Sequence, residues 1–208
     1  MARGSGGGAS RPTPQTGLFG GTFDPVHNTH LQIARAAADQ FRLTKVLFIP
    51  AARPPHKAGG ASASYEDRMR MLELACQADE RFEVSRMEAP SATGEAEPSY
   101  SILTIERLLA QSAGPLSFII GADAFAEITG WHRWEDVVAA VQFIVVTRPG
   151  AEYTVPPGAE VDDLKGIESS DSSTSVRAKL LRAEFDVPVP EAVIRYIREF
   201  GLYQSHVA

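Results

Sequence analysis

The sequence predicts an α/β fold built on a doubly wound parallel sheet, with a small helical part at the C-terminal end. Short apolar runs alternate along the chain with segments whose apolar residues recur at helical spacing. The connections between these segments are short, which brings consecutive elements side by side. The run Lys45–Pro50 is continuously apolar from Val46 onward, as in strands that are buried on both faces. Together these observations indicate helices on both faces of a parallel sheet.

The expected strands are short apolar runs that lead into a turn or a loop. They are Gly17–Gly21, Lys45–Pro50, Phe82–Ser85, Ser117–Asp123 and Phe143–Gly150. The stretch that follows Gly150 has no clear pattern, so no strand is expected there.

The expected helices follow these strands and begin at residues that cap helices. They start at about Asn28, Ser64, Ser99, the turn after Asp123, the segment after Trp134, the run SSDSSTSVRAKLL and Pro190. Ser64 and Asp67 have the spacing of a capping box. Val193, Ile194 and Ile197 form the apolar face of the last helix, which Gly201 ends.

Length and composition favour one globular domain that binds neither nucleic acid nor membranes. The chain has 208 residues, is 44% hydrophobic and carries a net charge of -6, so it has no broad basic surface. Residues 1–15 are rich in Gly, Ser and Pro and are expected to form a disordered leader, with one domain over residues 16–208. The single cysteine, Cys76, lies in an apolar helical pattern, which favours a buried thiol and a reducing cytoplasm.

The fold predicts where a ligand binds. In open α/β sheets, ligands lie beyond the carboxyl ends of the strands, near the point where the strand order reverses. The segments that follow those ends are Gly20–His30, Ala51–Lys57, Gly121–Asp123 and Arg148–Gly150. Most of the chemically informative residues lie in them.

The stretch GLFGGTFDPVHNTH has the features of an anion site. Gly20 and Gly21 are expected to let the backbone turn sharply and approach a ligand. A helix that starts near Asn28 offers unpaired N–H groups and the positive end of its dipole. His27 and His30 have the spacing to face one spot, where partly protonated imidazoles would add positive charge.

This stretch has two other interpretations. A zinc site needs a third and usually a fourth ligand, but His56, His132 and His206 are scattered, so no metal site is expected. An ordinary strand–helix turn would account for the glycines but for neither histidine.

A second anion site is predicted in SSTSVR, from Ser172 to Arg177. Taken alone, this run predicts an N-cap followed by a solvated arginine. Paired with the first site, it indicates the second half of a clamp on a polyphosphate. The chain contains neither a Walker A loop nor a G-x-G-x-x-G fingerprint.

The two motifs together resemble the nucleotidyltransferase superfamily marked by H-x-G-H and SSTxxR. The further segments VLFIPAARPPHK, RFEVS, PSYSILTIERL, FIIGADAF, WHRWEDV, RPG and YIREFGLY resemble, in order, the bacterial nicotinate-mononucleotide adenylyltransferase family. The resemblance covers nearly everything from Gly17 to Tyr203 and implies a Rossmann-like nucleotidyltransferase fold. Thr29 stands where this family usually has glycine, and Ser101 where it usually has threonine.

The resemblance implies a role for each residue that matches a family motif. The catalytic residues are expected to be His27, His30, Lys57 and Arg177. The ATP-binding residues are expected to be Gly20, Gly21, Thr22, Phe23, Gly121, Asp123, Ser173 and Thr174. The nicotinate-binding residues are expected to be Ser101, Trp131 and His132. Read on their own, Lys57 fits a solvated loop lysine, Asp123 a helix N-cap and Trp131 an ordinary packing contact.

The implied reaction joins nicotinate mononucleotide and ATP and releases pyrophosphate. The attacking 5′-phosphate is mostly ionised at neutral pH, since its second pKa is about 6, so no general base is needed. Mg²⁺ is expected to be carried mainly by the ATP phosphates. The oligomeric state is left open, with a homo-oligomer as one option. A transferase with another phosphate acceptor and a regulatory nucleotide-binding module remain as alternatives, although the four expected catalytic residues count against the module.

Overall fold

The computed structural model describes residues 15–54, 60–91, 97–111, 114–147, 152–167 and 171–204. Within them the chain forms a six-stranded sheet of order β3-β2-β1-β4-β5-β6, in which every neighbouring pair is parallel. The strands are β1 (Thr16–Gly21), β2 (Lys45–Pro50), β3 (Phe82–Val84), β4 (Leu116–Gly121), β5 (Gln142–Val146) and β6 (Glu160–Leu164). This architecture confirms the predicted fold class.

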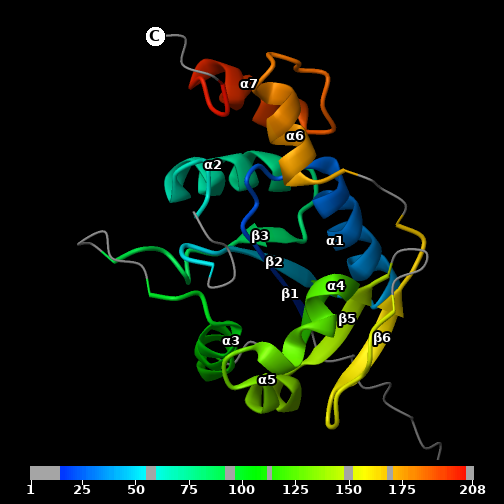
Figure 1. Ribbon diagram of the computed structural model, residues 1–208. Coiled ribbons are helices and arrows are strands. Elements are labelled where there is room, and N and C mark those ends of the chain that lie inside the picture. Colours follow the sequence, from blue (N-terminus) through cyan, green and yellow to red (C-terminus); the bar gives the residue numbers. More distant parts are fainter. Residues whose placement is uncertain are drawn as a thin grey trace, which may run out of the picture.

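Helices cover both faces of the sheet (Figure 1). They are α1 (Asn28–Gln40), α2 (Tyr65–Cys76), α3 (Ser101–Ala110), α4 (Ala122–Ala126), the 3-10 turn Ile128–Gly130, α5 (Trp134–Ala140), α6 (Ser173–Leu180) and α7 (Glu191–Glu199). One core joins the sheet to α1, α2, α6 and α7, and a second joins it to α3, α4 and α5. The C-terminal helical part therefore packs into the first of the two cores.

Alternating strand residues supply the two cores. In β4, Ile119 faces the first core, whereas Phe118 and Ile120 face the second. In β1, Phe19 faces the first core and Leu18 faces the second. Because each face is covered, both sets must be apolar, which explains why the strands appear in the sequence as continuous apolar runs.

The strand order reverses next to β1. The chain runs from β1 outward to β2 and β3, then returns to place β4 on the other side of β1. The crevice between the carboxyl ends of β1 and β4 is therefore the place where a ligand is expected. Gly21 and Gly121 end these two strands.

Several local predictions differ from the structure. The sixth strand, β6, lies in the stretch for which no strand was expected, and in it Leu164 is the buried residue. The N-cap of α3 is Tyr100, not Ser99, whose Oγ accepts a hydrogen bond from the backbone N–H of Arg53 at 3.2 Å. Residues 1–14 of the predicted leader lie outside the described residues, and the side chain of Gln15 donates to Ser117 Oγ at 2.6 Å.

Candidate active site

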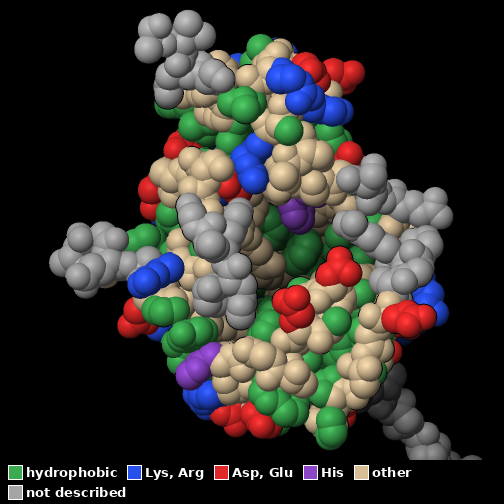
Figure 2. Space-filling view, in the orientation of Figure 1, with side chains coloured by type: hydrophobic (Ala, Val, Ile, Leu, Met, Phe, Trp, Pro, Cys, Tyr) green, Lys and Arg blue, Asp and Glu red, His purple; other side chains and the backbone are tan. Residues whose placement is uncertain are grey.

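A cavity of about 360 Å³ opens at the carboxyl edge of the sheet, at the reversal of strand order. Figure 2 shows the hollow on this face, with a histidine side chain at its upper edge and acidic side chains along its lower edge. The predicted site residues that line it are Gly20, Gly21, Thr22, Ser101, Gly121, Trp131 and His132. The structure therefore brings residues from β1, β4, α3 and the segment before α5 to one opening.

The turn after β1 is formed by other residues than the two glycines that were predicted to form it. Gly20 and Gly21 belong to the extended strand, whereas Phe23 adopts the left-handed conformation with φ of 49°. A Cβ on Gly21 would come within 3.0 Å of the Phe23 ring. The expected sharp turn at the glycines is therefore wrong, and Gly21 is needed because the Phe23 ring packs against it.

Phe23 turns its ring into the core and not toward the cavity. The side chain is 2% exposed, and its ring centroid lies 5.7 Å from that of Phe19 and 5.0 Å from that of His30. The contact with His30 is edge-to-face, an arrangement that aromatic rings favour. Phe23 thus supports a predicted catalytic side chain from behind.

His27 and His30 lie together at the start of α1, as their spacing predicts. Their ring centroids are 3.8 Å apart, and His27 is buried whereas His30 is partly exposed. Nδ1 of His30 accepts a hydrogen bond from the backbone N–H of His27 at 3.2 Å. An imidazole that accepts at Nδ1 carries its proton on Nε2, so His30 is a donor at Nε2.

His30 is neutral at physiological pH. Burial, with a smaller contribution from His27, lowers the pKa of His30 well below its usual value of 6.5. The expectation of a partly protonated imidazole is therefore wrong at this position. Removing an imidazole from water disfavours its charged form, and the neighbouring His27 acts in the same direction.

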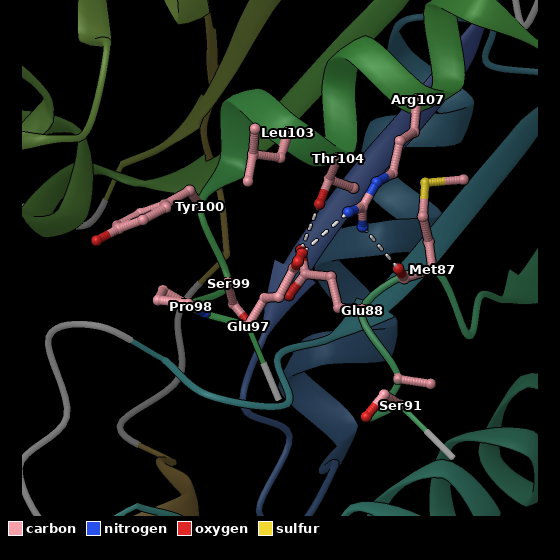
Figure 3. Close-up of a pocket in the computed structure, with 11 residues that line it drawn as sticks. Met87, Glu88, Ser91, Glu97, Pro98, Ser99, Tyr100, Leu103, Thr104 and Arg107 are labelled. Atoms are coloured by element: carbon pink, nitrogen blue, oxygen red, sulfur yellow. Dashed lines mark hydrogen bonds and ion pairs between the residues drawn. The ribbon is translucent and has the colours of Figure 1, made fainter. Parts of the chain in front are cut away.

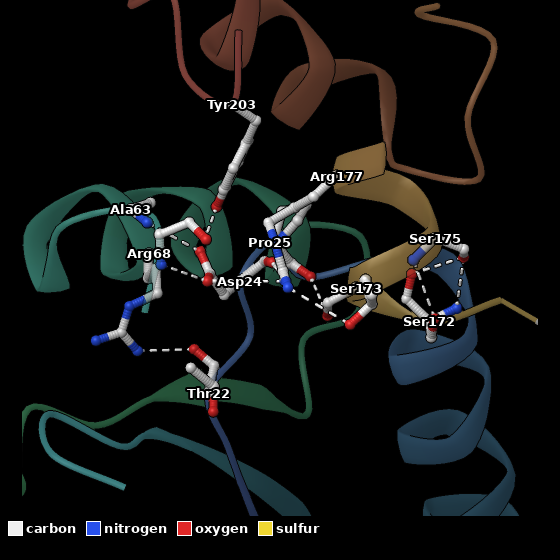
Figure 4. A network of polar contacts seen from close by, with 12 residues as sticks. Thr22, Asp24, Pro25, Ala63, Arg68, Ser172, Ser173, Ser175, Arg177 and Tyr203 are labelled. Atoms are coloured by element: carbon white, nitrogen blue, oxygen red, sulfur yellow. Dashed lines mark hydrogen bonds and ion pairs between the residues drawn. The ribbon is translucent and has the colours of Figure 1, made fainter. Parts of the chain in front are cut away.

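The start of α6 lies against the turn that follows β1, as the clamp requires (Figure 4). Ser173 Oγ donates to the backbone carbonyl of Pro25 at 3.0 Å, and Arg177 Nη1 donates to that of Asp24 at 2.6 Å. Arg177 Nη2 also reaches Thr174 Oγ1 at 3.4 Å. These contacts join segments 148 and 153 positions apart and bring the two predicted anion sites together.

Asp24 is a buried carboxylate that the sequence interpretation missed. It is 1% exposed and accepts hydrogen bonds from the backbone N–H groups of Ser62, at 2.7 Å, and Ala63, at 3.1 Å. The Tyr203 hydroxyl donates to it at 2.8 Å, and Arg177 forms an ion pair with it at 3.8 Å. Burial opposes its ionisation, but these hydrogen bonds and the nearby cation outweigh burial and hold the pKa of Asp24 below its usual value.

Arg68 is a second buried charge at the same turn. It is 1% exposed, and its Nη1 donates to the backbone carbonyls of Thr22 at 2.7 Å and Ala51 at 2.9 Å. It therefore ties the end of β1 to the end of β2, while burial lowers its pKa. Its position four residues before Leu72, on the apolar face of the helix, was the signal that could have revealed it.

Aromatic side chains surround the other end of the cavity. The Trp131 ring packs edge-to-face on Phe118, with centroids 6.0 Å apart, and also lines the cavity. The exposed His132 ring stacks on Tyr100, with centroids 4.4 Å apart. Tyr100 also lines the cavity, although the sequence interpretation did not single it out.

A smaller hollow of about 230 Å³ adjoins the cavity and shows how the start of α3 is held (Figure 3). Thr104 Oγ1 donates to Glu88 Oε1 at 2.7 Å. Arg107 donates to the carbonyl of Met87 at 3.2 Å and pairs with Glu97 at the same distance. These contacts fasten the helix that carries Ser101 to the segment after β3.

Other predicted site residues lie elsewhere. Asp123 is exposed, does not line the cavity, and sits in the first turn of α4, whose N-cap is Gly121. The N-cap interpretation of Asp123 is therefore wrong. Lys57 and Arg148 lie outside the described residues. Thr29 is 4% exposed and does not line the cavity, so its side chain does not crowd that space.

Among the residues that the structure describes, no group of three or more His, Cys, Asp or Glu side chains has the geometry to hold a metal ion. Within the same residues, none of the helices combines the length and apolar character needed to cross a membrane.

The fold and site are those of a nucleotidyltransferase, and the comparisons with known proteins agree with this class. The family model described as cytidylyltransferase-like matches residues 18–179, which places the chain among the nucleotidyltransferases of that class. The chain is 51% identical over 188 residues to a probable nicotinate-nucleotide adenylyltransferase of Solibacter usitatus, with 89% of this chain and 97% of that protein covered. It is 38% identical to one from Gloeobacter violaceus, with coverages of 90% and 95%.

The chain belongs to the nicotinate-nucleotide adenylyltransferase family and is a nucleotidyltransferase enzyme. The structure of Plasmodium falciparum nicotinic acid mononucleotide adenylyltransferase complexed with NaAD matches it with a TM-score of 0.71 at 16% identity. That match covers 91% of this chain and 97% of the other and shows the shared fold. The family resemblance predicted from the sequence is thereby confirmed.

Proposed function

We propose that this enzyme transfers the adenylyl group of ATP to nicotinate mononucleotide, forming nicotinate adenine dinucleotide and pyrophosphate for NAD biosynthesis in the cytoplasm. The observation that carries the proposal is the contact between the two anion motifs. Arg177 and Ser173 bind the backbone of the turn that leads to His27 and His30. This cradle lies at the carboxyl edge of the sheet, beside the cavity that Trp131 lines.

The triphosphate of ATP fits the cradle. The N-terminal ends of α1 and α6 both present the positive ends of their dipoles. The Asn28 N–H of α1 already donates to the Pro188 carbonyl at 2.8 Å, so α1 contributes mainly through its dipole and His30. Arg177 adds a permanent positive charge, and His30 adds a neutral Nε2–H donor. Ser173 Oγ donates to Pro25, so its hydroxyl holds the turn. Its backbone N–H belongs to the first turn of α6, where N–H groups have no partner within the helix.

The pyridine end of the acceptor fits the aromatic part of the cavity. The Trp131 ring offers a stacking surface, and the Ser101 hydroxyl and the His132 backbone N–H are donors suited to a carboxylate. A cavity of about 360 Å³ has the size of a small-molecule site. These features support an acidic aromatic acceptor over an aliphatic one.

The chemistry needs alignment and charge stabilisation. An oxygen of the mononucleotide phosphate attacks the α-phosphorus of ATP, a new P–O bond forms, and the bond to the departing pyrophosphate breaks with its electron pair. His30 donates from Nε2 to a non-bridging oxygen as charge develops there, and Arg177 stabilises the leaving pyrophosphate. Mg²⁺ enters with ATP as part of the substrate and neutralises phosphate charge.

One assay tests the proposal against its alternatives. The protein is incubated with ATP, Mg²⁺ and either nicotinate or nicotinamide mononucleotide, and both pyrophosphate and dinucleotide are measured. Formation of nicotinate adenine dinucleotide with equimolar pyrophosphate is expected. Product with unrelated phosphate acceptors only would favour a different transferase, and ATP binding without pyrophosphate would favour a regulatory module.

A further inference from the structure

The C-terminal part of the chain reaches the phosphate end of the site through Tyr203, which follows α7. Its hydroxyl donates to Asp24 Oδ1 across 179 positions, and its ring packs against the first core (Figure 4). Burial and the Asp24 carboxylate raise the pKa of Tyr203, so the hydroxyl keeps its proton at every physiological pH. Tyr203 is therefore a permanent donor to Asp24.

Asp24 in turn holds the guanidinium of Arg177. Arg177 Nη1 donates to the Asp24 carbonyl at 2.6 Å and lies 3.8 Å from Asp24 Oδ2, and its side chain is 21% exposed. A guanidinium has five N–H donors. Most of them remain for a phosphate while the group itself is fixed on the turn.

We propose that Asp24 and Tyr203 are positioning residues for ATP: Tyr203 fixes the orientation of the Asp24 carboxylate, and Asp24 fixes the guanidinium of Arg177 against the triphosphate. The inference rests on the proposed function, because that function assigns Arg177 to the triphosphate. Neither residue touches the substrate. Asp24 is 1% exposed, and Tyr203 lies behind it on the side of α7.

The geometry explains why the Tyr203 hydroxyl matters to Arg177. Oδ1 of Asp24 receives Tyr203 and Ala63, whereas Oδ2 receives Ser62 and faces Arg177. Without the Tyr203 hydroxyl, Oδ1 loses a donor, and the carboxylate turns to pair more closely with Arg177. A tighter ion pair neutralises the cation and competes with the phosphates of ATP.

The test compares two tyrosine variants. Tyr203→Phe removes the donor to Asp24. Tyr196→Phe is the matched control, because the half-buried Tyr196 hydroxyl donates to Asp67 Oδ1 at 2.9 Å, again between the C-terminal part and α2, without contact to Arg177. Both variants should lower Tm, Tyr203→Phe by more, because its partner Asp24 is 1% exposed whereas Asp67 is partly exposed. Only Tyr203→Phe should raise the KM for ATP, about fivefold, the factor expected when one hydrogen bond is weakened.

The KM for the mononucleotide should stay constant in both variants. Equal KM values for ATP in Tyr203→Phe and Tyr196→Phe would overturn the inference. Calorimetric titration with ATP and Mg²⁺ makes the same comparison without turnover. A wild-type protein that binds ATP but makes no dinucleotide would defeat the proposed function, while the Kd values of the two variants would still decide this inference.

A second background tests the route through Arg177. In Arg177→Lys, the fork that contacts Asp24 is absent, so adding Tyr203→Phe should leave the KM for ATP unchanged. A further rise equal to that seen in the wild-type background would show that Tyr203 acts by another route and would refute the proposal.

Discussion

His30 offers the sharpest test of the proposed chemistry, because its tautomer follows from one hydrogen bond. Nδ1 accepts the His27 N–H at 3.2 Å, so catalysis depends on the donor at Nε2. Asparagine places its amide near the position of Nδ1, whereas glutamine reaches the position of Nε2. His30→Gln should therefore keep a donor toward the phosphate, and His30→Asn should lose it.

The expected magnitudes follow from the loss of one preorganised donor. Such a loss lowers kcat by about 10²–10³-fold. The kcat of His30→Asn and of His30→Ala should therefore fall by at least about a hundredfold. The kcat of His30→Gln should fall by about tenfold, because the amide donates from a position that differs slightly from that of Nε2. The KM for ATP should change little, since the donor acts mainly in the transition state. Steady-state kinetics of pyrophosphate release measure all three variants, and a His30→Asn enzyme as active as His30→Gln would refute the assigned tautomer.

The pH dependence provides a second readout of His30. Because the pKa of His30 lies well below 6.5, the ratio of wild-type to His30→Gln kcat should stay flat from pH about 6.5 to about 8.5. A ratio that falls tenfold per pH unit across this range would show that a protonated His30 is required.

Stability should also depend on pH through His30. In the unfolded chain His30 takes up a proton near pH 6.5, whereas the folded protein keeps it neutral, so the unfolded state binds more protons as the pH falls. Wild-type stability should therefore decline below pH 6.5 relative to His30→Gln, by up to about 1.4 kcal/mol per pH unit. Urea unfolding at several pH values measures this difference, which should become independent of pH above pH about 7.5.

The remaining predictions concern the acceptor site, a surface cluster and the thiol. Ser101→Ala should raise the KM for nicotinate mononucleotide about tenfold and leave the KM for ATP unchanged, and equal losses for both substrates would contradict the assignment. Asp79→Asn should lower the free energy of unfolding by about 1 kcal/mol at neutral pH. Because hydrogen bonds from Arg81 hold the pKa of Asp79 at about 2, that difference should disappear as the pH falls from 3.8 toward 2. Burial raises the pKa of Cys76 to about 12, so a thiol reagent should label it in denaturant but not in the folded protein.

The sequence predicted the parts of the fold that have a local signal. The run Lys45–Pro50 is a strand with the predicted bounds, because burial on both faces makes it apolar from Val46 onward. The edge strand Glu160–Leu164 was missed for the opposite reason. It has one neighbour, exposes part of its side chains and contains Asp162 and Asp163, so no apolar run marks it.

The same distinction applies to the site. His27, His30 and the SSTSVR run carry anion-binding signals of their own, so their meeting could be predicted. The partners of Asp24, Arg68 and Tyr203 could not, because they lie in distant segments. Only the burial of Arg68 has a local signal, its place on the apolar face of the helix. A charged residue in the sequence indicates exposure, and its burial becomes visible only when the fold supplies the donors and acceptors that satisfy it.

The join between the turn after β1 and the start of α6 has a consequence for synthesis on the ribosome. A nascent chain that ends before Ser172 contains the histidines, β1 and the whole parallel sheet, but not the second half of the triphosphate cradle. Contacts over such long sequence separations form late in folding. Growing chains should therefore not capture cellular ATP, and the ability to bind it should emerge only after α6 has left the exit tunnel and docked.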